Sequence, residues 1–176
     1  MSIMKEKKVY ILDTSAILSG KPINLDDAEI FTTIGVSKEI NLGGKDYFLF
    51  QVLLEKKLNI CSPSKDSIEK IINKSIKTGD FNRLSKVDKE ILALALDMKN
   101  KGKKPVIITD DYSIQNIASI LRIEFIGINQ QGITKKYKWI YQCRGCGKKF
   151  KDNIQICPIC GDKTRNIIVK KENLKK

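Results

Sequence analysis

The sequence predicts an α/β protein with a central parallel sheet between two layers of helices, followed by a small cysteine-rich module. Short apolar segments alternate with segments of helical periodicity through the first 128 residues, and this alternation is typical of a parallel sheet covered on both faces. Two C-x2-C pairs follow within the last quarter of the chain, where a compact metal-binding ribbon is expected.

Five short apolar runs are predicted to form the strands of the sheet. They cover residues 9–12, 30–33, 58–61, 106–109 and 123–128.

Helices are predicted to fill the intervals between these runs. They are expected at residues 16–18, from 36, at 47–57, at 64–77, from 85, and at 112–121. Ser85 and Asp88 have the S-x-x-D spacing of a capping box, and Gly79 is expected to end the helix that Ser64 caps. Glu39 and Asp88 are both expected in the first turn of a helix.

The net charge is concentrated at the C-terminal end. Residues 1–134 hold 20 basic and 17 acidic side chains, whereas residues 135–176 hold 13 basic and 3 acidic ones. This local excess favours a polyanion as the partner, most simply a nucleic acid, over the alternative of a solubilising lysine-rich tail.

The chain has five cysteines and no histidine. Ser–His and Cys–His nucleophile pairs, a histidine base and a mixed Cys/His zinc site are therefore excluded. Acid–base or metal chemistry must depend on carboxylates, lysines, tyrosines, cysteines or water.

Acidic side chains follow the predicted strands at the edge where an open α/β sheet binds its ligands. Asp13 comes directly after the first strand, and Asp110 and Asp111 come directly after the fourth. Glu39 and Asp88 belong to helices that should start at the same edge. Each acid alone is explained as a helix cap or as a partner of the helix dipole.

Together, these carboxylates would repel one another and raise their own pKa values unless a cation lies between them. Mg²⁺ or Mn²⁺ is the hard cation that suits carboxylate and water ligands, and it supports hydrolysis of phosphate esters. We therefore expect one or two such ions at this edge.

Four segments resemble the motif series of the PIN-domain ribonucleases: LDTSA, VSKEI, LSKVDKEILALAL and ITDDYSIQNIA. The resemblance implies a PIN-like three-layer α/β/α domain with an endonuclease site that uses divalent metal. The catalytic acids that it implies are Asp13, Glu39, Asp88 and Asp111, of which Asp13, Asp88 and Asp111 hold the Mg²⁺ or Mn²⁺.

The family pattern T-x-D after the last central strand is matched by Thr109 and Asp111. Asp110 is the intervening residue, which either tunes the site, helps to hold a second ion or caps the helix. Many members carry a further acid two residues later, where this chain has Ser113.

The cysteine pairs Cys143/Cys146 and Cys157/Cys160 are separated by ten residues, and each is followed by glycine. Four thiolates provide the closed tetrahedral coordination of one structural Zn²⁺, so this ion is not expected to be catalytic. Disulfides or a redox pair are the alternatives. Cys61 lies outside the pairs and is expected to be a small buried apolar residue.

Aromatic residues alternate with basic ones around the cysteine module. Tyr137, Trp139, Tyr141 and Phe150 either stack on single-stranded RNA or form the core of the ribbon. The basic side chains that we expect to contact RNA are Lys135, Lys136, Lys138, Arg144, Lys148, Lys149 and Lys151.

The order of the two modules is itself informative. The whole chain resembles the archaeal ribosome-biogenesis endonucleases of the Nob-one type, through LDTSAILSGK, PSKDSIEK, TGD, TDDYSIQNIA and W-x3-C-x2-C. The resemblance implies cleavage of precursor small-subunit ribosomal RNA at its mature 3′ end, on a pre-ribosomal particle and beside a KH-domain partner. A toxin-type PIN ribonuclease acting on tRNA or mRNA, and a noncatalytic RNA-binding assembly factor, are the alternatives.

The predicted domains are a nuclease domain at residues 1–128, a basic linker at 129–138 and a zinc ribbon with a basic tail at 139–176. Gly132 suggests a hinge in the linker. No apolar run reaches the ~18 residues of a membrane span, and the N-terminal apolar stretch is shorter than the ~7–15 residues of a signal-peptide core. We therefore expect a cytoplasmic protein.

Overall fold

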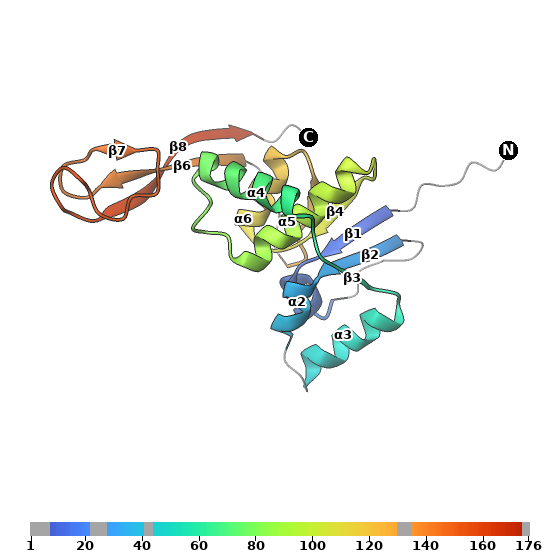
Figure 1. Ribbon diagram of the computed structural model, residues 1–176. Helices are drawn as coiled ribbons and strands as arrows, with labels where there is room; N and C mark the ends of the chain where they lie inside the picture. The colour runs from blue at the N-terminus through green and yellow to red at the C-terminus, as the bar shows by residue number, and fades with distance from the viewer. Residues whose placement is uncertain (1–7, 22–27, 41–43, 130–134, 174–176) are drawn as a thin grey trace.

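The computed structural model describes residues 8–21, 28–40, 44–129 and 135–173. Its larger part is a five-stranded sheet in the order β3-β2-β1-β4-β5, in which all neighbouring strands are parallel (Figure 1). The strands are β1 (Lys8–Leu12), β2 (Ala28–Thr33), β3 (Asn59–Cys61), β4 (Pro105–Ile108) and β5 (Glu124–Ile126). The predicted α/β class with a central parallel sheet is confirmed.

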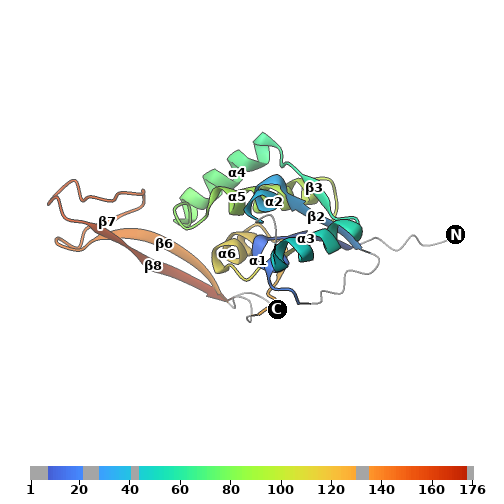
Figure 2. The ribbon, with the colours of Figure 1, turned by 90° about the horizontal axis from the view of Figure 1, so that it is seen from below.

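The helices of the described ranges are α1 (Thr14–Leu18), α2 (Ile34–Glu39), α3 (Lys45–Glu55), α4 (Lys65–Thr78), α5 (Lys86–Asn100) and α6 (Tyr112–Ile120). α5 lies over β1, β2 and β4 and packs against α4. α1 and α3 contact each other on the other side of the sheet (Figures 1 and 2). Among the described residues, no helix has both the length and the apolar composition to span a bilayer.

The core lies between the central strands and the long helices. Its fully buried side chains come mainly from β1, β4, α5 and α6. The largest include Ile11, Leu12, Ile91, Leu92, Ile107, Ile108, Ile114 and Ile117. These apolar strands are buried on both faces, as a parallel sheet requires.

Local capping signals set the ends of the long helices. Ser64 accepts a hydrogen bond from the Ser67 amide at 3.2 Å and begins α4. The predicted capping box at the start of α5 is present, with the Ser85 amide donating to Asp88 at 2.6 Å and the Asp88 amide donating to Ser85 at 3.1 Å. Gly79 ends α4 at φ 81°.

Two expectations about single residues are wrong. Glu39 is the last residue of α2 instead of lying in its first turn, because the helix already begins at Ile34, where the Thr33 side chain caps the Val36 amide. Cys61 is only half-buried at the end of the edge strand β3, where it packs against the core.

The C-terminal module is an antiparallel sheet in the order β7-β6-β8. Its strands are β6 (Lys135–Cys143), β7 (Lys149–Phe150) and β8 (Thr164–Asn173). Figure 1 shows that β6 and β8 form a long arm that carries the cysteine knuckles away from the parallel sheet. Residues 135–138 of the expected linker are part of β6, and Gly132, the expected hinge, lies outside the described residues.

The base of this arm is hydrogen-bonded to α6. The Asn116 side chain accepts from the Tyr137 amide at 2.9 Å and donates to the Tyr137 carbonyl at 3.1 Å, so it pairs with β6 as a neighbouring strand would. It also donates to Asp80 at 3.0 Å. Burial is the main cause of the raised pKa of Asp80.

The turn after α4 makes the second contact with the arm. The Arg83 guanidinium lies 4.4 Å from the centroid of the Trp139 ring. A Cβ atom on Gly79 would collide with the backbone carbonyl of Trp139. Only glycine allows both the left-handed turn and this close approach.

Gly79→Ala should therefore lower the free energy of unfolding of the zinc-loaded protein by about 2–3 kcal/mol. The left-handed conformation alone costs about 1–2 kcal/mol, and displacement of the arm adds to it. Gly102→Ala is the matched control, because Gly102 has φ 80° and nothing within 4 Å of a built Cβ. Urea denaturation of the two variants measures the difference, and equal losses would contradict the close contact with Trp139.

Candidate active site and zinc centre

Asp13 is the most buried acid of the predicted set, with 5% of its surface exposed. It follows β1 and caps α1, and its carboxylate accepts hydrogen bonds from the Thr14 amide at 2.7 Å and the Ser15 hydroxyl at 3.0 Å. The Thr109 hydroxyl, which follows β4, donates to it at 2.7 Å. Burial nevertheless raises the pKa of Asp13, and the neighbouring Asp88 raises it further.

Asp88 is half-buried in the first turn of α5. Its pKa is raised, first by burial and then by the negative charges of Asp111 and Glu39, although the capping bonds to Ser85 oppose this shift. Asp13, Glu39, Asp88 and Asp111 are thus close enough for Asp88 to interact electrostatically with the other three.

The adjacent aspartates after β4 differ in their partners. Asp111 caps α6 and accepts from the Ser113 and Ile114 amides. Asp110 instead accepts from the Ile128 amide at 2.7 Å and from the Asn129 side chain at 2.7 Å. Asp110 therefore ties down the segment after β5, whereas Asp111 lies beside the other acids.

Glu39 is exposed at the end of α2, where its carboxylate accepts a hydrogen bond from the Thr14 hydroxyl. Thr14 and Ser15 are not among the predicted site residues, although both hydroxyls bind site carboxylates. Only their position directly after Asp13 in the sequence indicates that these two hydroxyls lie near the acids.

The carboxylates form an open cluster. Within the described ranges, the cysteine set is the one group of three or more possible metal ligands whose atoms all lie within 4.8 Å of one another. An ion shared by these carboxylates would therefore have to be held in part through water, as Mg²⁺ and Mn²⁺ commonly are.

The four paired cysteines converge on one point. The Sγ atoms of Cys143 and Cys160 are 3.3 Å apart, and those of Cys146 and Cys157 are 3.7 Å apart. Tetrahedral Zn–S bonds of about 2.3 Å place neighbouring sulfurs roughly 3.8 Å apart. The donor set therefore fits a structural Zn²⁺.

The predicted RNA-contacting cations lie along the arm and the first knuckle, and all except the half-buried Lys136 are exposed. The aromatic residues are less available for stacking. Tyr141 is buried and accepts a hydrogen bond from Asn82 at 2.9 Å, and Trp139 lies under Arg83. These two rings attach the arm to the nuclease domain instead of forming an open stacking surface.

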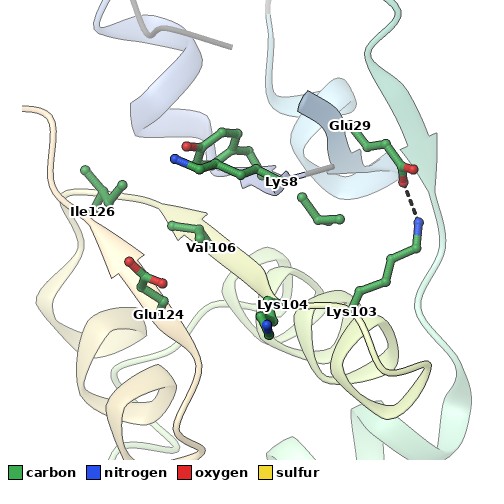
Figure 3. Close-up of a pocket in the computed structure, with 9 residues that line it drawn as sticks. Lys8, Glu29, Lys103, Lys104, Val106, Glu124 and Ile126 are labelled. Carbon is green, nitrogen blue, oxygen red and sulfur yellow. Dashed lines mark hydrogen bonds and ion pairs between the residues drawn. The ribbon is translucent and has the colours of Figure 1, made fainter. Parts of the chain in front are cut away.

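A pocket of about 350 Å³ lies at the opposite edge of the sheet, at the amino ends of the strands (Figure 3). It is lined by charges of both signs, including Lys8, Lys104 and Glu124, and Lys103 forms an ion pair with Glu29 across it. Because these acids are interspersed with lysines, this pocket does not compete with the acidic edge as a candidate metal site.

This chain matches a known family model over its first half and known proteins over most of its length. The family model "PIN domain of ribonuclease" matches residues 10–98. The chain is 39% identical over 158 residues to "Endoribonuclease Nob1" of Archaeoglobus fulgidus, covering 90% of each chain. It is 35% identical over 163 residues to "Endoribonuclease Nob1" of Pyrococcus abyssi (92% of this chain, 94% of the relative). It is also 37% identical over 166 residues to "Ribonuclease VapC1" of Thermoplasma acidophilum (94% and 81%).

Asp13→Asn should stabilise the protein in the absence of divalent metal and raise its melting temperature by about a few degrees, the scale of a typical single substitution in a chain of this size. The raised pKa of Asp13 means that its ionised form destabilises the fold. The gain is therefore complete above that raised pKa and shrinks as the pH is lowered toward the unfolded value of about 4. With added Mn²⁺, the wild type should become more stable than Asp13→Asn, because the ion binds the wild-type carboxylate more tightly.

Thermal denaturation at several pH values, with and without Mn²⁺, measures this effect. Glu69→Gln on the exposed face of α4 is the control, and it should change neither the melting temperature nor its response to Mn²⁺. An Asp13→Asn variant that is less stable than wild type in the absence of metal would contradict the cost assigned to the buried charge.

Cys157→Ser should lower the zinc content from one ion per chain to well below one and unfold the ribbon, since structural zinc supplies folding free energy. Cys61→Ser, which changes the remaining cysteine, should retain the full zinc content. Elemental analysis and amide hydrogen exchange of β6 to β8 measure both effects. Full zinc content in Cys157→Ser would contradict the assignment.

Proposed function

The chain belongs to the PIN-domain ribonucleases and is homologous to the archaeal Nob1 endoribonucleases, and from this premise we propose that it cleaves precursor small-subunit ribosomal RNA at its mature 3′ end. The protein is an endoribonuclease, so the alternative of a noncatalytic assembly factor is set aside. This proposal rests on the similarity to Nob1 over 90% of both chains, which extends well beyond the PIN domain match at residues 10–98.

The catalytic residues in this proposal are Asp13, Glu39, Asp88 and Asp111. Asp13, Asp88 and Asp111 hold one or two Mg²⁺ or Mn²⁺, in part through water, and Glu39 completes the negative site. Two observations support the set: the raised pKa values of Asp13 and Asp88, to which the neighbouring acids contribute, and the Glu39–Thr14 hydrogen bond.

When bound, the divalent ion activates water and neutralises charge on the scissile phosphate. The side chains of this site orient the hydrolysis. Asp13 is fixed by Thr109 and Ser15, Asp111 is fixed by the amides of the helix that it caps, and Asp88 is fixed by the Ser85 amide in the capping box. Hydrolysis then leaves a 5′-phosphate and a 3′-hydroxyl.

Asp110 is assigned a supporting role. Its hydrogen bonds to Ile128 and Asn129 position the segment that leads toward the arm. It affects the acidic site through the backbone that it shares with Asp111.

In this proposal, the basic side chains of the ribbon bind the RNA. The contacts are Lys135, Lys136, Lys138, Arg144, Lys148, Lys149 and Lys151, six of which are exposed. The substrate is presented on a small-subunit pre-ribosomal particle in the cytoplasm, with a KH-domain protein as the neighbouring factor.

A toxin-type activity on tRNA or mRNA is the second candidate, because "Ribonuclease VapC1" is also similar over 94% of this chain. Cleavage-site mapping separates the two. The zinc-loaded protein with Mn²⁺ should cut a ribosomal RNA fragment at one position, the mature 3′ end, and should leave tRNA intact. Preferential cutting of tRNA, or scattered cuts in the ribosomal fragment, would favour the toxin-type reading.

Asp111→Asn should reduce the rate of cleavage more than Asp110→Asn. Asparagine caps a helix as well as aspartate does, so the fold at Asp111 is kept while the charge is lost. We expect a loss of at least about 100-fold, above the 10–100-fold that residues supporting a metal ligand typically show. Single-turnover cleavage in Mn²⁺ compares the two variants, and the reverse order would show that Asp110 is the ligand.

A further inference from the structure

A polar pocket lies where the nuclease domain meets the ribbon. It has a volume of about 350 Å³ and is lined by Asn82, from the turn before α5, and by ribbon residues that include Asn153, Gln155, Lys163 and Arg165. None of these residues belongs to the acidic site or to the cations predicted to contact RNA.

Hydrogen bonds fix its two walls to each other. The Asn82 side chain donates to the Tyr141 hydroxyl at 2.9 Å, and the Asn153 side chain donates to the side-chain oxygen Oδ1 of Asn82 at 2.8 Å. Tyr141 is buried in β6 and is paired with Asn166 of β8, which also lines the pocket. The walls of the pocket are therefore held together by hydrogen bonds between the nuclease domain and the ribbon.

The lining has the chemistry of a nucleotide site. Of its nine residues none is acidic, two are cations and most of the others carry neutral hydrogen-bonding groups. Lys163 and Arg165 suit a phosphate, and asparagine and glutamine side chains offer a donor and an acceptor to the edge of a base.

The size and position of the pocket restrict the ligands that it can hold. A volume of about 350 Å³ is at the small end of the 300–1,000 Å³ range of ligand pockets, which suits one nucleotide but not a duplex. Unpaired nucleotides are the ones whose base edges proteins read in RNA. Asn82 lies six residues before Asp88, in the turn that leads into α5.

We propose that this pocket binds one unpaired nucleotide of the RNA substrate, with Lys163 and Arg165 on its phosphate and the amides of Asn82 and Asn153 on its base. The pocket selects the base by the donors and acceptors on its edge. The inference rests on the proposed function only in taking RNA as the substrate. Holding one selected nucleotide between the ribbon and α5 sets which phosphate reaches the acids.

Binding of labelled hexanucleotides tests this without cleavage. The zinc-loaded full chain carrying Asp13→Asn is titrated with oligo-A, oligo-C and oligo-U, and fluorescence anisotropy gives the affinities at several salt concentrations. We expect one hexamer to bind at least about fivefold more tightly, the lower end of what one amide–base pair provides. Adding Asn82→Asp or Asn153→Ala should abolish that preference.

Matched variants separate base reading from charge. Asn82→Asp keeps the shape of the side chain and can accept a hydrogen bond from the Tyr141 hydroxyl, so the junction is kept. Asn100→Asp adds the same charge at the exposed end of α5 and should leave the preference among the hexamers unchanged. Arg165→Ala should weaken all three hexamers alike and lower the salt slope by about one, whereas Lys45→Ala on α3 should not. Zinc content and melting temperature verify the fold of each variant.

Equal affinity for the three hexamers in the unaltered pocket would overturn the proposal, and so would an unchanged preference in both Asn82→Asp and Asn153→Ala. The cleavage map is a separate readout. If the protein cuts tRNA but its binding preference still depends on Asn82, the proposed function is wrong and the nucleotide pocket stands. If it cuts ribosomal RNA at the mature 3′ end but shows no such preference, only the nucleotide pocket is wrong.

Discussion

The hydrogen bond from Thr109 to the buried Asp13 carboxylate joins the ends of β1 and β4, and the acidic edge of the sheet depends on it. Thr109 also accepts from the Asp111 amide at 3.0 Å, and Ser15, which donates to Asp13, accepts from the Asp110 amide at 3.1 Å. The position of the paired aspartates is therefore set from the Asp13 carboxylate. Because burial disfavours the charge on Asp13, the same geometry that fixes these acids also favours a cation among them.

Most of the fold follows from local signals in the sequence. Apolar runs identify all five parallel strands, and the Ser64, Ser85 and Gly79 signals place the ends of α4 and the start of α5 where the structure has them. The start of α2 is not predictable from the sequence pattern, because Thr33 and Ile34 continue a β-branched run that favours a strand. In the structure Thr33 turns to cap the helix instead, and this brings Glu39 to the site from the last turn of α2.

The site was only partly predictable, because the missing information lies in contacts between distant segments. The cysteine spacing is sufficient to predict a zinc ribbon, since four ligands within one short stretch define their own geometry. The aromatic residues of β6 give no such local indication. Whether Tyr141 faces RNA or protein depends on Asn82, which lies 59 residues earlier in the chain. The difference between Asp110 and Asp111 likewise appears only once the segment after β5 is in place.

Asp13 and Asp111 are helix N-caps and Asp88 completes the capping box of α5, each with the carboxylate that is also proposed to hold metal. The nuclease domain can therefore complete its folding with these acids satisfied by backbone amides, before any divalent ion arrives. The ribbon has no comparable core and needs its zinc in order to fold. The two proposed metals therefore differ in their expected roles: the zinc belongs to the fold of the ribbon, whereas the divalent ion binds a nuclease domain that is already folded.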